Sequence, residues 1–571
     1  MGLRKGWSRR VGRRLAPLGL LVMVAAAPAP PARVKAPDAQ AAFMAGNYAE
    51  AYRLIGLAIA ACRAPASQPD RCLDLLEAGT NQATAAGDAL TAERWARQAL
   101  ALARTLPDRG EEALVMVTLA GALIGQGRLE EAEALDRQAL PMARTALGEA
   151  HPFIAAIQNN LALLLDARGR HAEAEPLHRA VVASVRATQG ETAASLPTLL
   201  NALADNLKGQ ARYRDAAPVY AEAVALARRI SGPEHPTVAL ALNSLADLQQ
   251  TLGRFAEAEA LFREAAAIDG KALGPNHPLV GRDLANLGAL YLAEGRLGEA
   301  ETQFRAALAI AEAADGKDHP AVASDLGNLA NVLVQLDRPE EAEALTRRAL
   351  AIDRKAFGED SPRLGGQYAS LAFNLEAQQR VPEAEPLRRR ALAIDKAAYG
   401  EAHPDAAASL SSLAGNLSLQ GRYADAEPLL RQALAAQEAA LGSDSLAVAG
   451  TLASLGVLEA RAGRPAEAEA PFRRSLDIRR ARLGEQAPGA ASGFHNLAAL
   501  LELLGRLDEA EPPARQALAI RRAILPPTHP DVAASETLLA RILGARPATR
   551  AEALDHARVA MAIVRARRIQ T

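Results

Sequence analysis

The sequence predicts an all-α fold, an α-solenoid of about thirteen stacked helix pairs. The main observation is a fixed spacing of 42 residues between ten arginines, most of which follow a glycine. Inside each interval apolar residues recur at helical spacing, and 50% of all residues are hydrophobic whereas only 3% are aromatic. A constant period of this size is typical of stacked repeats, because each unit buries its apolar face only against its neighbours. The ten arginines are Arg128, Arg170, Arg212, Arg254, Arg296, Arg338, Arg380, Arg422, Arg464 and Arg506.

Residues 1–27 have the layout of a secretory signal segment. Arginines and lysines crowd the first 14 positions, and the apolar run 15–27 follows them. This run of 13 residues is too short to cross a bilayer as a helix. We therefore expect a secreted or periplasmic protein with no stable membrane insertion after signal removal; the alternative is a cytoplasmic chain with a basic leader. Residues 28–37 are rich in Pro and Ala and predict a linker.

The charge balance argues against a nucleic-acid partner. The formal net charge is −1, and without the basic leader 59 basic residues face 66 acidic ones. A chain that binds nucleic acid normally presents a basic surface to the phosphates.

The two cysteines, Cys62 and Cys72, flank a segment that predicts a loop between two helices. In an oxidising compartment they are well placed for a disulfide. The alternative is two partly buried thiols. Two cysteines with no histidine nearby do not suggest a metal site.

Three segments make up the predicted array. Residues 38–126 form irregular helix pairs, since Gly46, Gly87 and Gly127 are 41 and 40 residues apart. Residues 127–528 form the regular array, and residues 529–571 form a C-terminal capping repeat. Atypical ends are expected of a solenoid, because a terminal unit has a neighbour on one side only.

Each unit predicts two helices. In the first, helix A, apolar residues follow the helical pattern, as Ile154 and Ile157 illustrate. His-Pro opens most of these helices, and proline is tolerated at the first helical position because its missing N–H would have no partner there. Glycine then ends helix A with a left-handed cap. Ala211, Asp337 and Gln379 replace that glycine in three units, so we expect strained or altered turns there.

The second helix, helix B, opens with an acidic turn, which suits the positive end of the helix dipole. In nearly every unit an arginine follows a glutamate after four residues, for example Glu343 and Arg347. This is the favourable order for an ion pair along a helix, and we interpret these pairs as part of the solvent-exposed face. The histidines of the His-Pro pairs are a full repeat apart, too far for one metal ion, so no metal site is expected there.

The units resemble the tetratricopeptide repeat (TPR). The 42-residue period, with segments such as LGEAHPFIAAIQNNLALLL at 147–165, is similar to the kinesin-light-chain subtype. The resemblance covers roughly residues 40–565. It implies a right-handed superhelix in which helix A lines the concave face and extended peptides are bound there. The pattern residues of one unit are Gly253, Phe255, Ala258, Phe262 and Ala265.

The resemblance also implies that asparagines of helix A hydrogen-bond the backbone of a bound peptide. An amide donates and accepts at once, as an extended backbone requires. The asparagines that match this phase are Asn159, Asn160, Asn201, Asn243, Asn286, Asn328 and Asn496. Polar residues that extend the lining are Asp205, Asp247, Gln250 and Asn331, and they favour a basic or polar segment near 160–335. The alternative is that some of these asparagines cap or bridge adjacent helices.

The sequence therefore predicts a non-enzymatic scaffold, without a cofactor, that binds an extended peptide or partner protein along the helix A face. Motifs for a phosphate-binding loop, a zinc protease or a serine hydrolase are missing from it. From about residue 366, a lining of small residues such as Gly366 and Ala369 suits a larger apolar side chain or a helix. The alternative function is a structural self-assembly module of the cell envelope.

Overall fold

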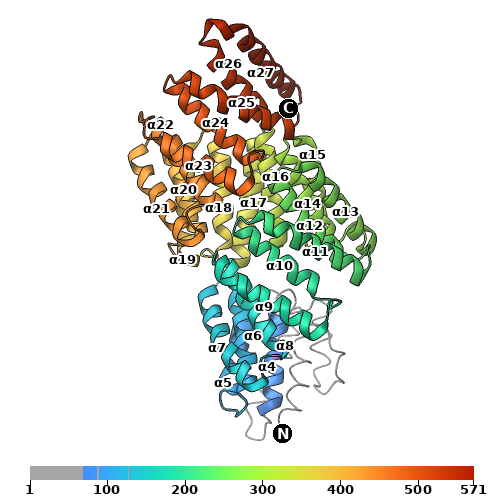
Figure 1. The fold of residues 1–571 in the computed structure, drawn as a ribbon. Coiled ribbons are helices and arrows are strands. Elements are labelled where there is room, and N and C mark those ends of the chain that lie inside the picture. Colours follow the sequence, from blue (N-terminus) through green and yellow to red (C-terminus); the bar gives the residue numbers. More distant parts are fainter. Residues whose placement is uncertain (1–68, 86–88, 127, 571) are drawn as a thin grey trace. The chain divides into compact units, whose positions relative to one another are not determined.

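The structure, a computed structural model, describes residues 69–85, 89–126 and 128–570 (Figure 1). Within this part of the chain it contains 24 α-helices, a short 3-10 helix and no strand, which confirms the predicted all-α solenoid. The predicted signal segment 1–27, the linker 28–37 and Cys62 lie outside the described residues. Cys72 is buried in the first described helix, and the disulfide between the two cysteines stays a prediction.

The chain divides into two compact units, Met1–Asn206 and Leu207–Thr571. The helices of the first unit are α4 (Pro69–Ala85), α5 (Ala89–Ala103), α6 (Arg109–Ile124), α7 (Leu129–Leu147), α8 (Pro152–Ala167) and α9 (His171–Gln189), and the unit boundary falls within α10 (Leu196–Gly209). Those of the second unit are α11 (Tyr213–Ser231), α12 (Pro236–Thr251), α13 (Phe255–Leu273), α14 (Pro278–Ala293), α15 (Leu297–Asp315), α16 (Pro320–Gln335), α17 (Pro339–Phe357), α18 (Arg363–Ala377), α19 (Val381–Tyr399), α20 (Pro404–Leu419), α21 (Tyr423–Leu441), α22 (Leu446–Arg461), α23 (Glu469–Leu483), α24 (Pro488–Leu503), α25 (Leu507–Ile524), α26 (Pro530–Gly544) and α27 (Arg550–Gln570), with the 3-10 helix η1 (Pro547–Thr549) before the last.

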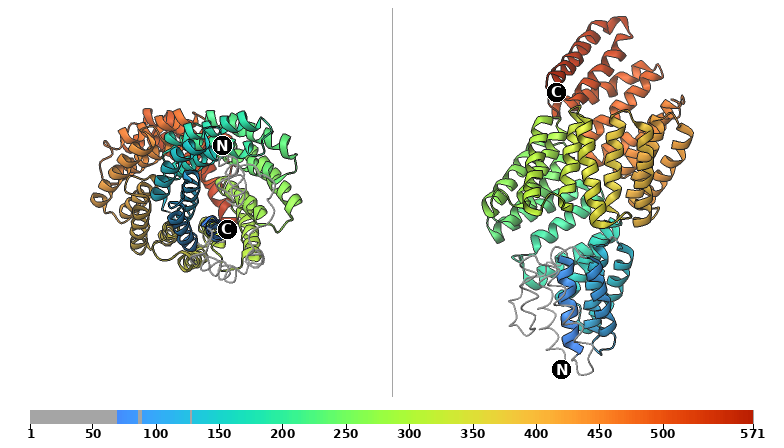
Figure 2. Two further views of the ribbon diagram at one scale, coloured as in Figure 1. Left: turned by 90° about the horizontal axis from the view of Figure 1, so that it is seen from below. Right: turned by 180° about the vertical axis from the view of Figure 1, so that it is seen from behind.

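Even-numbered helices are the predicted helices A and odd-numbered ones are helices B. From α11 to α27 each helix packs on the next one along the chain, and Figure 2 shows these helices lying side by side. Small residues permit this close packing. A Cβ atom on Gly288 of α14 would lie 2.9 Å from the ring of Phe304 in α15, so only glycine fits at this crossing.

The predicted helix starts and ends are both observed. The His-Pro histidines are N-caps whose Nδ1 accepts a hydrogen bond from the backbone N–H two residues on, at 3.2 Å for His277. The glycines that end helix A have positive φ, and so do Ala211, Asp337 and Gln379, at 55°, 60° and 63°. The expected strain at these three turns is therefore present, because side chains with a Cβ are disfavoured in this region.

Replacing these three residues by glycine should stabilise the protein. Relief of the left-handed strain outweighs the added flexibility of the unfolded chain, so we expect Ala211→Gly and Gln379→Gly each to raise the free energy of unfolding by about 0.5–1 kcal/mol. Asp337→Gly should gain less, because aspartate tolerates this conformation. Urea denaturation followed by circular dichroism would measure the change, and a loss of stability in Ala211→Gly would contradict the prediction.

Within the second unit, a late part of the array contacts an early part. Gly253, in the turn after α12, faces Pro488 at the start of α24, and a Cβ on this glycine would lie 2.5 Å from the proline Cδ. One repeat later Gly295 faces His529 in the same manner. Leu525 packs on the apolar cluster around Phe255. The array is thus held by contacts between segments far apart in sequence as well as between neighbours.

Two glycines with the same backbone conformation test this contact. Gly253 and Gly463 have φ of 78° and 80°, but no atom lies within 4 Å of a Cβ built on Gly463. Gly463→Ala should lower the unfolding free energy through backbone strain alone. Gly253→Ala should lower it by about 1–3 kcal/mol more, because the added methyl group meets Pro488.

A double-mutant cycle with Pro488→Ala supplies the control, since it should remove the excess cost of Gly253→Ala and leave that of Gly463→Ala unchanged. Equal unfolding free energies for the two alanine variants would show that the contact does not form in solution.

Candidate functional site on the helix A face

Most asparagines predicted to meet a peptide are covered in this structure. Asn160, Asn201 and Asn243 are 5%, 6% and 7% exposed. Asn159 and Asn496 are partly exposed, and Asp205 is exposed on α10. The structure brings these residues to helices A, as expected, and their role in recognition stays a prediction.

Two of the asparagines bridge adjacent A helices. Asn243 of α12 donates through Nδ2 to Oδ1 of Asp283 in α14 at 2.8 Å, and Asn286 of α14 donates to Oδ1 of Asn243 at 3.4 Å. These bonds match the bridging alternative that the sequence left open. Both amides already spend hydrogen-bonding capacity inside the protein.

The two remaining polar residues of the first half also have neighbours within the chain. The carboxylate of Asp247 forms an ion pair with Lys208. Asp247 and Gln250 line a cavity of about 340 Å³ beside Pro488 and Arg521. The attraction of this surface for a basic ligand is therefore weakened, because the carboxylate of Asp247 already pairs with the cation of Lys208.

Asn328 and Asn331 are different, because both are exposed on α16 and open into a groove. The groove lies between α16 and α18 and has a volume of about 570 Å³. No side-chain hydrogen bond of the described residues engages either amide. Its lining consists of Ala323, Ser324, Gly327, Asn328, Ala330, Asn331, Thr346, Arg363, Gly366, Gln367, Ala369, Ser370, Phe373, Asn374 and Arg388.

The lining of this groove includes two arginines and no acidic residue. Arg388 is ion-paired with Glu376 at 2.7 Å. The Arg363 guanidinium lies over the ring of Phe357, 4.6 Å from its centre, and no ion pair engages it among the described residues. Phe373 is 43% exposed at the groove. The groove therefore combines amides, hydroxyls, an aromatic ring and an arginine outside any ion pair of the described residues, whose charge opposes the burial that raises the pKa of the nearby Asp353.

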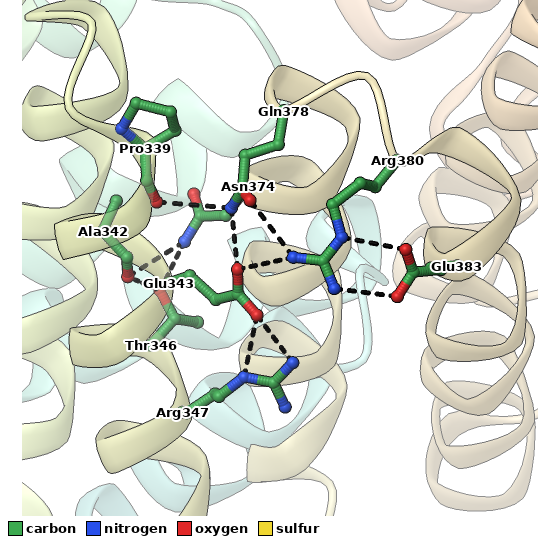
Figure 3. A network of polar contacts seen from close by, with 9 residues as sticks. All are labelled: Pro339, Ala342, Glu343, Thr346, Arg347, Asn374, Gln378, Arg380 and Glu383. Atoms are coloured by element: carbon green, nitrogen blue, oxygen red, sulfur yellow. Dashed lines mark hydrogen bonds and ion pairs between the residues drawn. The ribbon is translucent and has the colours of Figure 1, made fainter.

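Hydrogen bonds fix the floor of the groove (Figure 3). Asn374 of α18 donates through Nδ2 to Thr346 Oγ1 at 2.6 Å and to the carbonyl of Ala342 at 3.2 Å, both in α17. Asn374 and Thr346 are almost fully buried. The helices that form the groove are thus held by satisfied buried polar groups, which specify one arrangement.

The 42-residue arginines join successive repeats, as Figure 3 shows for Arg380. Its guanidinium donates to Glu343 of the preceding repeat at 2.9 Å and to Glu383 of its own helix at 2.9 and 2.8 Å. Glu343 also accepts from Arg347 and Gln378. Burial acts to raise the pKa of Glu343, but Gln378, Arg347 and Arg380 outweigh it and hold the pKa below its ordinary value.

These contacts form an Arg–Glu ladder, defined as each 42-residue arginine with the glutamate of the repeat before it. The ladder pairs are Arg128–Glu93, Arg170–Glu133, Arg296–Glu259, Arg338–Glu301, Arg380–Glu343, Arg422–Glu385, Arg464–Glu427 and Arg506–Glu469, at 2.6–3.0 Å. The sequence predicted the pairs within helix B, but not this second role of the glutamates. The signal was a spacing of 37 residues between glutamate and arginine in most pairs. Ala217 occupies the glutamate position for Arg254, so the ladder is interrupted there.

A second set of contacts, also missed, links helix B to the next helix A across 14 residues. Buried or partly buried polar pairs at this spacing are Asp353–Gln367 at 2.9 Å, Asp395–Ser409 at 2.5 Å, Gln437–Thr451 at 2.7 Å and Arg521–Ser535 at 2.7 Å. At the corresponding position Asp269 and Asp283 are both fully buried, and Arg282 contacts both. Burial, with the charge of Asp283, raises the pKa of Asp269 to about 6.

Asp325 occupies the position of Asp283 one repeat later, and its counterpart 14 residues earlier is Ala311. Burial raises the pKa of Asp325 to about 6 from an ordinary value of 3.8. Above this pKa the folded protein holds a charge that burial disfavours. As the pH falls through 6 towards 3.8, the folded state takes up a proton first, and this penalty disappears.

Asp325→Asn should therefore stabilise the protein at neutral pH and not in acid. Allowing for solvent screening of this partly exposed group, we expect a gain of about 1–2 kcal/mol in unfolding free energy at about pH 7.5, and none near pH 4. Denaturant unfolding of both proteins at each pH measures this. Asp477→Asn, at an exposed aspartate of α23, is the matched control and should change the unfolding free energy by at most a few tenths of a kcal/mol, since it loses only an exposed ion pair with Arg480. An equal gain at both pH values would exclude the titration as its cause.

In the described part of the chain, side chains of His, Cys, Asp and Glu do not gather in groups of three or more that could hold a metal ion. None of the helices in the described ranges is long and apolar enough to span a bilayer.

Comparisons with known proteins agree with the repeat pattern. The Tetratricopeptide repeat family matches residues 111–187, 195–271, 250–313, 283–355, 367–439, 407–481 and 489–566. No curated protein matches the chain. Among solved structures, the chain is similar to a Podosopora anserina kinesin light chain protein with nearly identical TPR-like repeats, at 27% identity over 36% of this chain and 97% of that chain, with a TM-score of 0.31. It is also similar to BtubC (BKLC) from P. vanneervenii, at 28% identity over 41% of this chain and 91% of that chain, with a TM-score of 0.33. Since the family matches recur from residue 111 to residue 566, the chain belongs to the tetratricopeptide repeat family.

Proposed function

We propose that this protein is a non-enzymatic scaffold that holds an extended acidic segment of a partner protein in the groove between α16 and α18. Tetratricopeptide repeats generally mediate protein–protein interaction. The observation that carries the choice of site is that two exposed amides on the predicted helix face, Asn328 and Asn331, open into a groove lined without acidic residues. The predicted secretory signal favours a role outside the cytoplasm.

The amides suit a peptide backbone. Asn328 and Asn331 are one helical turn apart on α16 and lie in the same groove. Each side chain can donate to a carbonyl and accept from an N–H of a bound strand. Because neither amide has a side-chain partner among the described residues, binding breaks no internal hydrogen bond.

The charge of the groove selects for acidic segments. Arg388 is neutralised by Glu376, whereas Arg363 lies over an aromatic ring and forms no ion pair among the described residues, although its charge also acts on the buried Asp353. Stacking on Phe357 orients the planar guanidinium while its N–H donors remain usable, an arrangement that suits a carboxylate. A basic segment would meet this cation with no carboxylate in the lining.

An apolar anchor accompanies the charge. Phe373 is a large exposed side chain of the groove, and Gly366 and Ala369 leave space beside it. Aromatic side chains in such a position contribute much of the binding energy at protein interfaces. We therefore expect the acidic segment to carry an apolar side chain that packs on Phe373.

A pair of fluorescent peptides tests the proposal. Both share one framework of leucine and serine, and the charged positions are all glutamate in one and all lysine in the other. Fluorescence polarisation should show binding of the glutamate peptide only. Asn328→Ala with Asn331→Ala should weaken it about tenfold, because two hydrogen bonds of roughly 0.5–1.5 kcal/mol each are lost.

Two further variants complete the test. Arg363→Glu should abolish the preference for the glutamate peptide, since the sign of the groove is reversed. Asn496→Ala is the matched control, because Asn496 has the same repeat position as Asn328 on α24 and lies outside the groove. Equal binding of the two peptides, or equal losses from the double variant and the control, would refute the proposed site.

A further inference from the structure

The last helix, α27, exposes an apolar stripe. Leu554, Met561 and Val564 are 54%, 53% and 49% exposed. With Ala557 they are spaced 3, 4 and 3 residues apart, so they share one face of the helix. Beside them α26 and α27 enclose a groove of about 740 Å³. In every earlier repeat of the second unit, helix B is covered on this side by the next helix A.

A comparison of α27 with α25 shows how this face differs from those that hold another repeat. The buried residues Ala553, Ala560 and Ile563 correspond to the buried Ala510, Ala517 and Ile520. At this alignment Leu554 takes the place of Glu511 and Val564 takes the place of Arg521.

Both replaced residues hold the following repeat in place. Glu511 accepts from Arg546 at 2.5 Å, and Arg521 donates to Ser535 at 2.7 Å. In α27, therefore, the two positions whose polar side chains would bond to a following repeat carry apolar side chains instead. This face is suited to an apolar partner and not to a further repeat of the same kind.

We propose that this face binds the same face of a second copy, with the two α27 helices antiparallel about a two-fold axis near Val559. In that register Leu554 of one copy lies opposite Val564 of the other, and Ala557 lies opposite Met561. Large residues thus meet small or medium ones, and the same patch serves both partners. A two-fold contact of this kind closes on itself and gives a dimer instead of a filament.

The charges of α27 favour the antiparallel direction. Glu552 and Asp555 lie in its first half, and the exposed Arg565 lies in its second half. Asp555 is held by Arg558 on its own helix at 2.9 Å, on the exposed surface. In this antiparallel register Arg565 of one helix lies opposite Ala553 of the other, beside Glu552 and Asp555, and the helix dipoles are opposed. Parallel packing would set like charges together.

Sedimentation velocity of the full chain over a range of concentrations tests the interface. The chain should sediment as a dimer whose fraction rises with concentration, at about micromolar levels for an interface of this kind. Leu554→Glu and Val564→Arg should each give monomers, because a charge is buried against an apolar residue at both ends of the contact. Leu419→Glu changes an equally exposed leucine of α20, 52% exposed, and should leave the dimer intact.

Mixing the two monomeric variants, Leu554→Glu and Val564→Arg, tests the register. Antiparallel pairing sets the introduced glutamate of one chain opposite the introduced arginine of the other and leaves the second end of the contact wild type, so the mixture should form a heterodimer. Wild-type chain that stays monomeric, or a Leu554→Glu chain that still dimerises, would overturn the proposal. Failure of the mixture to associate would overturn the antiparallel register. Binding of the glutamate peptide should be the same in Leu554→Glu and wild type, which separates this inference from the proposed groove.

Discussion

Each helix pair of this chain buries its apolar face mainly against the pairs beside it. The stability of the fold therefore depends on the interface between successive repeats, and the recurring residues of the sequence lie at this interface. Alanine and glycine at the crossings bring helices together, as Gly288 does against Phe304. The Arg–Glu ladder then adds a directional contact to an apolar one, since Arg380 reaches one glutamate in its own helix and another in the repeat before.

The interface between repeats also explains which features of such a protein can be predicted from its sequence and which cannot. The helix pairs, the helix starts at the His-Pro pairs and the strained turns at Ala211, Asp337 and Gln379 were predicted, because each depends on residues adjacent in the chain. The ladder was not, because a glutamate such as Glu343 was interpreted within its own helix. Its second partner lies 37 residues away, and only the stacking of repeats brings the two together.

The candidate site shows the same limit at finer scale. One residue along a helix turns the side chain by about 100°. In the second unit Asn243, eight residues after a cap histidine, is buried, whereas Asn328, nine residues after one, is exposed. The sequence placed these amides on helix A, but could not separate amides that bridge helices from amides that face a groove. That distinction depends on the neighbouring repeat, where Asp283 provides Asn243 with a partner.

The contact between Gly253 and Pro488, with its counterpart between Gly295 and His529, constrains how this protein can evolve. Solenoids ordinarily gain or lose whole repeats by duplication and deletion, since each unit contacts only the units next to it. Here the loss of a single unit between these positions would move α24 and α26 out of step with the glycines they meet. The number of repeats in this segment is thus constrained by these two contacts. Selection on that number acts through residues that are far apart in the sequence.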